Sequence, residues 1–337
     1  MKTPTFNILL PKNPKQMATK LTRRVEKGFS LIELLIATAI SLLILLAVSA
    51  LFINSSRSER TNGAASEITT NGRYAIEVLR RDLLHAGYRG ITSIPNSYLT
   101  TSLGNATGDC AAGFYTNTAT NPIGGNIYVL EGVFGLNDSN PYSATCIPAA
   151  NYSTGDILVT RHAAQSPKAA ATNVVSLRST YGKWELFKGA TGPAAFIKTP
   201  QFDYPLETAV YFISPFSETS GDGLPALYKV SLSAGPAMTS SLVASNIENM
   251  QVQYEFSDKN SATITTRFYN ANDLSKTVTP SQWDSVTAVR LWLLVRANNT
   301  EPGYTNTSSY IMGDKTITVS DGFRRELFST VVQVRNP

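Results

Sequence analysis

The sequence predicts an α+β protein in which one long N-terminal helix packs on an antiparallel, β-rich globular domain. Two observations carry this prediction. Residues 29–53 form an apolar run with one charge, Glu33, and a helical pattern continues from this run to about residue 88. After residue 90 the chain changes to short β-rich runs, separated by long loops of Asn, Thr, Ser, Gly and Pro.

The first 28 residues are strongly basic. They hold Lys2, Lys12, Lys15, Lys20, Arg23, Arg24 and Lys27 against Glu26, a net charge of +6. The whole chain has 29 basic and 24 acidic residues, so residues 29–337 keep 22 basic and 23 acidic ones, close to −1. This balance gives no general electrostatic signal for nucleic acid. Basic residues beside a membrane segment stay in the cytoplasm, so we expect the rest of the chain to face outward. Translation could start at Met1 or at Met17, and both starts stay open.

The apolar run is long enough to cross a membrane. Its 25 residues, at about 1.5 Å each, exceed the roughly 30 Å hydrocarbon core. An unpaired carboxylate such as Glu33 inside a membrane helix costs on the order of 2–4 kcal/mol, which indicates a functional role. A secretory signal peptide cut near Ala47–Ala50 would have a shorter apolar core. A plain membrane anchor fits the length but does not explain a Gly-Phe pair followed by Glu33.

The segment Lys27-Gly28-Phe29-Ser30-Leu31-Ile32-Glu33-Leu34 resembles the type IV prepilin family, whose leaders are also called class III signal peptides. The resemblance implies that a prepilin peptidase cuts between Gly28 and Phe29 and methylates the new N-terminus. It also implies that Glu33 pairs with the α-amine of Phe29, on a neighbouring subunit during assembly. Opposite charges attract strongly at the edge of a low-dielectric medium, which supports this pairing. The expected divisions are a leader at 1–28 and a membrane and assembly helix at 29–53.

Residues 54–90 are expected to continue this helix with one apolar face. Apolar residues recur at helical spacing, while three charged residues lie on another face. The apolar positions are Ile68, Ile76, Leu79, Leu83 and Ala86, and the charged ones are Arg73, Glu77 and Arg81. Gly63 and Gly72 should weaken the helix by about 1 kcal/mol each. Gly87 and Gly90 indicate its C-terminal end.

Residues 91–337 are expected to form one outward-facing, β-rich domain. Val289, Leu291, Leu293 and Val295 alternate with residues of a second face that also carries Trp292 and Leu294, which favours a central strand covered on both faces. Val331, Val332 and Val334 suit a closing strand. The candidate strands are 127–133, 156–161, 173–178, 184–188, 208–213, 226–232, 250–256, 288–296 and 326–334. Whether the domain has one lobe or two stays open.

The two cysteines, Cys110 and Cys146, both follow the apolar run. An even number of cysteines outside the cytoplasm favours a disulfide between them. Closing a loop of this length would stabilise the fold by roughly 3–4 kcal/mol. No histidine lies near either cysteine in the sequence, so we expect no metal site there.

Catalytic patterns are not found, and we expect neither enzymatic activity nor a cofactor or metal. His85 is expected to pack or to lie on the surface, and His162 to lie in a loop. Asp314 and Asp321 do not have the spacing of an EF-hand. Three arginines lie near the C-terminus: Arg324, Arg325 and Arg335. We interpret them as solvated surface charges; the alternative is that they form an interface with a partner pilin or with DNA.

A further set of segments lies beyond the leader: Asn71–Ala75, Arg81–Tyr88, Asn246–Tyr254, Val286–Arg290, Leu294–Arg296, Phe323–Phe328 and Val334–Asn336. Together these segments resemble the PilW family of minor pilins. Residues 91–240 carry no recognised signature. The resemblance implies a pilin-like fold and a minor pilin that primes type IV pilus assembly from the inner membrane and remains at the pilus tip. It implies as partners other minor pilins, the major pilin, prepilin peptidase, the inner-membrane assembly machinery and a possible tip adhesin.

Three alternatives stay open. A minor pseudopilin of a type II secretion system would share the leader and the helix. A tip protein could bind a ligand or DNA through the polar loops at 91–126 and 297–321, although nothing in the sequence supports nucleic acid. A membrane-anchored enzyme would need catalytic residues that the sequence does not offer. The sequence does not separate twitching, adhesion and DNA uptake.

Overall fold

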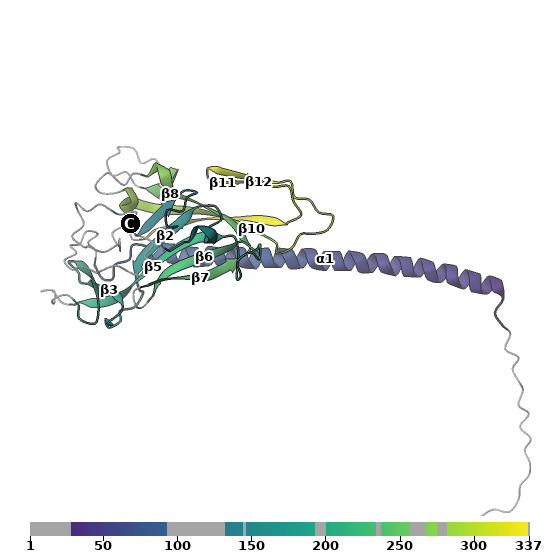
Figure 1. The fold of residues 1–337 in the computed structure, drawn as a ribbon, viewed down its shortest axis with the longest axis horizontal. Coiled ribbons are helices and arrows are strands. Elements are labelled where there is room, and N and C mark those ends of the chain that lie inside the picture. Colours follow the sequence, from purple (N-terminus) through teal and green to yellow (C-terminus); the bar gives the residue numbers. More distant parts are fainter. Residues whose placement is uncertain are drawn as a thin grey trace, which may run out of the picture. The chain divides into compact units, whose positions relative to one another are not determined.

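The structure is a computed structural model of the chain and describes residues 28–92, 132–143, 146–192, 200–233, 237–256, 267–274 and 282–335. Its one long helix, α1, runs Leu31–His85 (Figure 1). The chain divides into two compact units, residues 1–57 and residues 58–337, and α1 contributes to both. The expected combination of a long N-terminal helix with an antiparallel β-rich domain is confirmed.

The second part of α1 packs one face against the sheets. Its buried residues are Ile68, Gly72, Ala75, Leu79, Asp82 and Leu83, whereas Arg73, Glu77 and Arg81 are exposed. The predicted faces are therefore confirmed. The helix ends at His85, five residues before the expected boundary at 90, because Gly87 adopts a left-handed φ of 76° that does not continue a helix.

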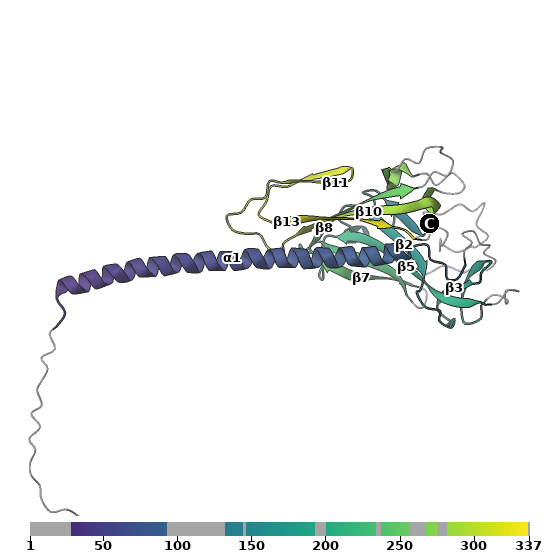
Figure 2. The same ribbon diagram turned by 180° about the vertical axis from the view of Figure 1, so that it is seen from behind.

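Gly72 is a contact position rather than only a weak point of the helix. A Cβ atom added there would lie 2.4 Å from the ring of Phe328, on strand β13 (Arg325–Gln333). The missing side chain therefore lets β13 approach the helix backbone. Figure 2 shows β13 running beside this part of α1.

Two antiparallel sheets and a hairpin make up the described part of the domain. In the larger sheet the order is β1-β2-β5-β3-β4, and β6 pairs with β5 and with β7. Its strands are β1 (Val133–Leu136), β2 (Ile157–Ala163), β3 (Val175–Ser179), β4 (Trp184–Lys188), β5 (Phe202–Ser214), β6 (Ala226–Ser233) and β7 (Ala237–Ser245). The smaller sheet has the order β13-β10-β8-β9, with β8 (Ile247–Phe256), β9 (Phe268–Asn270) and β10 (Val286–Arg296). A separate hairpin pairs β11 (Ser309–Met312) with β12 (Lys315–Thr318).

Short 3-10 helices occupy Ala149–Asn151, Ala271–Asp273 and Gln282–Ser285. Of the predicted strands, β2, β3, β4, β6, β8, β10 and β13 are confirmed with shifts of at most three residues at their ends. Strand β5 is also confirmed, but it begins at Phe202, six residues before the predicted start. Strands β7, β9, β11 and β12 were not predicted. In the predicted strand 127–133, residues 127–131 lie outside the described residues, and β1 begins at Val133.

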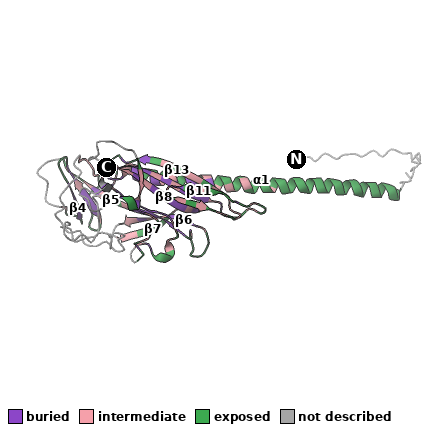
Figure 3. Ribbon diagram, turned by 90° about the horizontal axis from the view of Figure 1, so that it is seen from above, coloured by how far each residue is buried: buried purple, intermediate pink, exposed green. Residues whose placement is uncertain are grey.

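Strand β10 lies between β13 and β8 and is covered on both faces, as its pattern predicts. The inward residues Val289, Leu291, Leu293 and Val295 are fully buried, and so is Leu294 on the opposite face. The main core joins α1 to both sheets, and a smaller core lies around Trp184 and Leu186 of β4 (Figure 3). The domain thus has one principal core with a satellite cluster.

One residue carries the chain from the larger sheet to the smaller one. Asn246 stands between β7 and β8 with a left-handed φ of 65°, and Asn tolerates this conformation better than most residues. Its carbonyl accepts the Arg296 N–H at 3.0 Å, and its side-chain Nδ2 donates to Glu67 on α1 at 2.8 Å. The turn between the sheets is therefore tied to the helix.

A buried carboxylate fastens α1 to the larger sheet. Asp82 is 7% exposed and accepts hydrogen bonds from the Tyr211 hydroxyl on β5 and from Lys229 Nζ on β6, the latter at 2.9 Å. Burial, and secondarily the Asp82 charge, raises the pKa of Tyr211, which keeps the phenol protonated as the donor. The charge of Asp82 is thus met by the Tyr211 hydroxyl, by Lys229 and, more distantly, by the exposed Arg81, whose Nε lies 4.0 Å from Asp82 Oδ1.

Replacing Asp82 with Ala should lower the free energy of unfolding by about 3 kcal/mol, because Lys229 and Tyr211 then lose their common acceptor. Denaturant unfolding of the full-length chain in detergent measures this change. The matched control is Glu77→Ala on the exposed face of the same helix, for which a change within about 0.5 kcal/mol is expected. Equal effects of the two substitutions would contradict the role given to Asp82.

A second buried carboxylate connects the β1–β2 region with β8. Asp156 is 1% exposed and accepts the N–H groups of Val252 at 2.7 Å and Asp138 at 3.0 Å. Burial raises the pKa of Asp156 from 3.8 to about 7, although these two hydrogen bonds act in the opposite direction. The neighbouring charges of Asp138 and Asp314 raise it further.

Because the folded-state pKa of Asp156 lies above its ordinary value, the folded state binds this proton more tightly than the unfolded state. This contribution to stability is complete below about pH 4 and is lost as the pH rises to about 7. We therefore expect the free energy of unfolding to fall across this window. Asp156→Asn should flatten that slope, whatever it does to overall stability, and Glu77→Gln should leave it unchanged. Denaturant titrations at several pH values provide the measurement, and an unaltered slope in Asp156→Asn would contradict the assignment.

Candidate functional site

The first candidate region is the N-terminal part of α1. It is the one described helix that is long and apolar enough to cross a membrane, and none of its most apolar window is buried. Large side chains from Leu31 to Ile53 are all more than half exposed. Such a surface requires lipid or other apolar helices around it.

The residues predicted for processing and assembly lie at the beginning of this helix. Ser30 and Glu33 form a capping box: the Ser30 N–H donates to Glu33 Oε2 at 2.8 Å, and the Glu33 N–H donates to Ser30 Oγ at 3.2 Å. Phe29 is 89% exposed, and nothing lies within 4 Å of a Cβ placed on Gly28. Residues 1–27 lie outside the described residues. Glu33 thus has a structural role as a helix cap that sequence reasoning did not predict.

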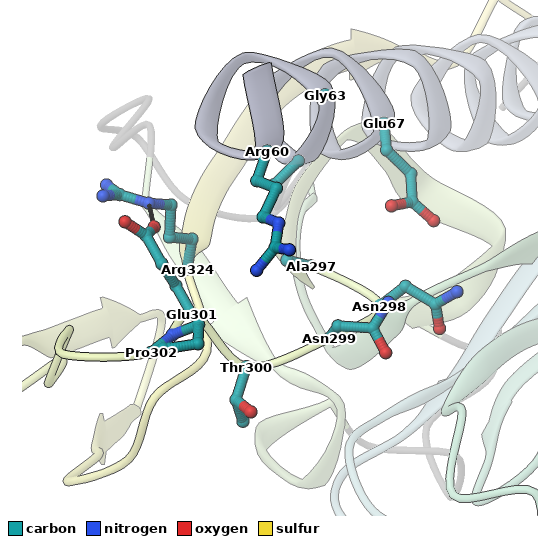
Figure 4. Close-up of a pocket in the computed structure, with 11 residues that line it drawn as sticks. Arg60, Gly63, Glu67, Ala297, Asn298, Asn299, Thr300, Glu301, Pro302 and Arg324 are labelled. Carbon is teal, nitrogen blue, oxygen red and sulfur yellow. Dashed lines mark hydrogen bonds and ion pairs between the residues drawn. The ribbon is translucent and has the colours of Figure 1, made fainter. Parts of the chain in front are cut away.

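The second candidate region is a pocket of about 470 Å³ in the domain unit. One wall is a face of α1, formed by Arg60, Gly63, Ala64 and Glu67, which follow the i, i+3, i+4, i+7 spacing of a helix. The other wall is the segment 297–302 after β10, together with Arg324. Figure 4 shows the Arg60 side chain extending from the helix into the opening.

Most charges of this pocket already have partners. Arg324 Nε donates to Glu301, which also accepts from Thr61 Oγ1 at 3.3 Å. The hydrogen bond to Glu301 raises the pKa of Arg324, so the guanidinium stays charged. Glu67 accepts from the Asn246 amide. In Figure 4 a dashed line joins Arg324 to Glu301, whereas Arg60 is joined to no pocket residue.

The sequence did not single out this pocket. On the helix wall two small residues, Gly63 and Ala64, lie between the charged residues Arg60 and Glu67. This pattern alone does not indicate a binding site. The other wall of the pocket belongs to residues 297–321, which were interpreted as a polar loop and in fact contain the β11–β12 hairpin. The hairpin lies against the smaller sheet, because a Cβ on Gly313 would lie 3.4 Å from Trp292 and from Gln253.

The interpretation of Arg325 as solvated charge is wrong. Its side chain is 2% exposed and forms paired hydrogen bonds with Glu248 on β8 and Asp321. These two carboxylates raise the pKa of Arg325 against the effect of burial, and Arg325 in turn lowers the pKa of Asp321. Because a guanidinium matches two carboxylates in fixed geometry, Arg325 is a structural clamp between β13 and β8.

The expected place of His162 is also wrong. It lies on strand β2 rather than in a loop and is 6% exposed. Its ring centroid is 5.7 Å from that of His85, and its Nε2 is 3.7 Å from Glu207. Each imidazole Nδ1 bonds a backbone carbonyl, that of Arg81 for His85 and of Ala163 for His162. The packing role expected for His85 is consistent with this arrangement.

No group of three or more His, Cys, Asp or Glu side chains in the described segments is arranged to hold a metal ion. The predicted disulfide is not tested by the described geometry: Cys146 packs on the main core, and Cys110 lies outside the described residues. The pairing of Cys110 with Cys146 therefore stays a prediction.

Two family models match the chain. Residues 210–336 match the model described as "Type IV Pilus-assembly protein W", and residues 23–49 match the "Prokaryotic N-terminal methylation motif". The second match contains Gly28, Phe29 and Glu33. The first runs from within β5 through β13 and includes Arg324 and the 297–302 wall of the pocket.

Among solved structures, a type IV-like pilin from Thermus thermophilus is similar to the chain at 15% sequence identity. The match covers 81% of this chain and 96% of that one, with a TM-score of 0.33. No curated protein is significantly similar to the chain.

Proposed function

Because the chain is a PilW-type type IV pilin, we propose that it is a minor pilin that primes pilus assembly together with other minor pilins and stays at the pilus tip. The observation that carries this proposal is that the chain has both an exposed apolar helical stretch, Leu31–Ile53, and a β-rich unit. The helix anchors the protein in the inner membrane and later packs among other pilin helices. The β-rich unit selects the partners, and its role is structural rather than enzymatic.

The proposed sequence of events begins with processing. Prepilin peptidase removes residues 1–28 and methylates Phe29, while the inner-membrane assembly machinery receives the mature subunit. Because Ser30 N–H occupies only Oε2 of Glu33, the second carboxylate oxygen is left for the Phe29 amine of a neighbouring pilin. Major pilin subunits then follow beneath the minor pilins, and the tip can carry an adhesin.

Glu33 has two separable roles in this proposal, and two substitutions distinguish them. Glu33→Gln keeps a side chain that can complete the capping box but removes the charge, whereas Glu33→Ala removes both. We expect both variants to be cut after Gly28 and both to enter pili at least tenfold less than the wild type. The mass of the mature chain and its amount in sheared pili give the two readouts. Normal incorporation of Glu33→Gln would show that capping, not charge pairing, is what assembly needs.

The role in priming is tested by counting surface pili in a deletion strain, with the retraction motor intact and then disabled. We expect pili to be lost when retraction is active and to return at least in part when it is disabled, because a priming subunit shifts the balance between extension and retraction. Complementation with the wild-type chain is the control. Unchanged pili in both backgrounds would contradict the proposal and favour a minor pseudopilin of a type II secretion system.

A further inference from the structure

Two charged residues that line the pocket, Arg60 and Glu67, have no counter-ion among its lining residues, but only Arg60 is also without a hydrogen-bond partner among the described residues. Glu301 is paired with Arg324 and Thr61, and Glu67 accepts from Asn246. Arg60 is exposed and forms no hydrogen bond or ion pair with another residue drawn in the pocket (Figure 4). A guanidinium in a recess is less screened than one on a flat surface, so an opposite charge placed there interacts strongly.

The groups around Arg60 are suited to a carboxylate. Asn298, Asn299 and Thr300 lie opposite the guanidinium on the other wall, and their amides and hydroxyl can donate hydrogen bonds. A guanidinium binds a carboxylate through two parallel N–H···O bonds. On the helix wall, Gly63 has no side chain and Ala64 has only a methyl group, so neither residue fills the pocket. Nothing lies within 4 Å of a Cβ placed on Gly63. A side chain can therefore enter from outside without displacing a residue of this chain.

The size of the pocket limits what can enter. About 470 Å³ accommodates a few side chains but neither a whole helix nor a sheet edge. The position favours a protein neighbour, because Arg60 follows the exposed apolar stretch by only seven residues on the same helix. Any pilin that packs along that stretch is brought close to this level of the helix.

We propose that the pocket binds an Asp or Glu side chain of a sister pilin, with Arg60 as the charged partner and the 298–300 segment as hydrogen-bond donors. This inference rests on the proposed function, since it assumes that sister pilins pack beside α1. It adds a contact that selects among pilins, because only a partner whose carboxylate lies opposite the pocket can form an ion pair with Arg60. A partner with a basic residue there is rejected.

The test uses the full-length chain in cells. A photo-crosslinking residue in place of Asn299 should yield a product whose mass-spectrometric peptide belongs to another pilin and contains Asp or Glu. Arg60→Glu should reduce recovery of the sister pilin with the tagged chain at least tenfold. Lys at the crosslinked acidic position should restore recovery with Arg60→Glu. The matched control is Arg73→Glu, the same charge change on an exposed position of the same helix outside the pocket, and it should leave recovery unchanged.

Several outcomes would overturn the pocket proposal. They are equal recovery with Arg60→Glu and Arg73→Glu, a crosslink to phospholipid alone, and a crosslinked pilin peptide without an acidic residue. If Arg60→Glu lowers the midpoint of thermal unfolding, Arg60→Gln is used in its place. Recovery of the sister pilin at the wild-type level with Arg60→Gln would then contradict the proposal. Failure here is distinguishable from failure of the proposed function: pili lost on deletion but restored fully by Arg60→Glu would refute the pocket alone.

Discussion

The structure depends on one constraint: a single helix, α1, has an exposed apolar surface over its first part and must pack one face on the β-sheets over its second part. From Leu31 to Ile53 the side chains of α1 are exposed and apolar, whereas from Ile68 to Leu83 only one face is buried. Among the described residues, the first stretch has no buried side chain that would select a rotation about the helix axis. The second stretch has such contacts, and they are specific: Gly72 admits Phe328, and Asp82 meets Tyr211 and Lys229. Apolar burial supplies most of the stabilisation, and the buried carboxylate fixes which face turns inward.

The smaller sheet is held to this helix by charges that the apolar pattern does not reveal. Arg325 spans Glu248 and Asp321, and Arg324 reaches Glu301, which in turn accepts from Thr61 on α1. The closing strand β13 is therefore bound through its first residues as well as through its ladder with β10. Together with Asn246, these contacts join the last strand, the turn between the sheets and the helix.

Local sequence patterns predicted the features that depend on neighbouring residues, which are the helix, most strands and the leader motif. The helix faces, the central strand β10 and seven further strands follow from periodicity in the sequence, and Gly28, Phe29 and Glu33 belong to one short sequence motif. The missed strands lack that signal. Strand β7 is mostly exposed and polar at Thr239–Ser241, and β11 and β12 form a short hairpin that is supported by Trp292 and Gln253 across the sheet rather than by its own pattern. The buried positions of Arg325 and His162 depend on partners far away in the sequence, so composition alone misplaced them.

The proposed contact at Arg60 assigns the selection of partners to the domain unit. Apolar helices attract one another without direction, so the stretch Leu31–Ile53 cannot by itself distinguish one pilin from another. The proposed contact at Arg60 can, because a partner with a basic residue at that position is repelled, whereas one with a carboxylate is attracted. Arg60 stands where the apolar stretch has ended and the walls of the domain begin. In the proposed assembly, helix packing supplies the affinity, and the proposed contact at Arg60 adds selectivity between sister pilins.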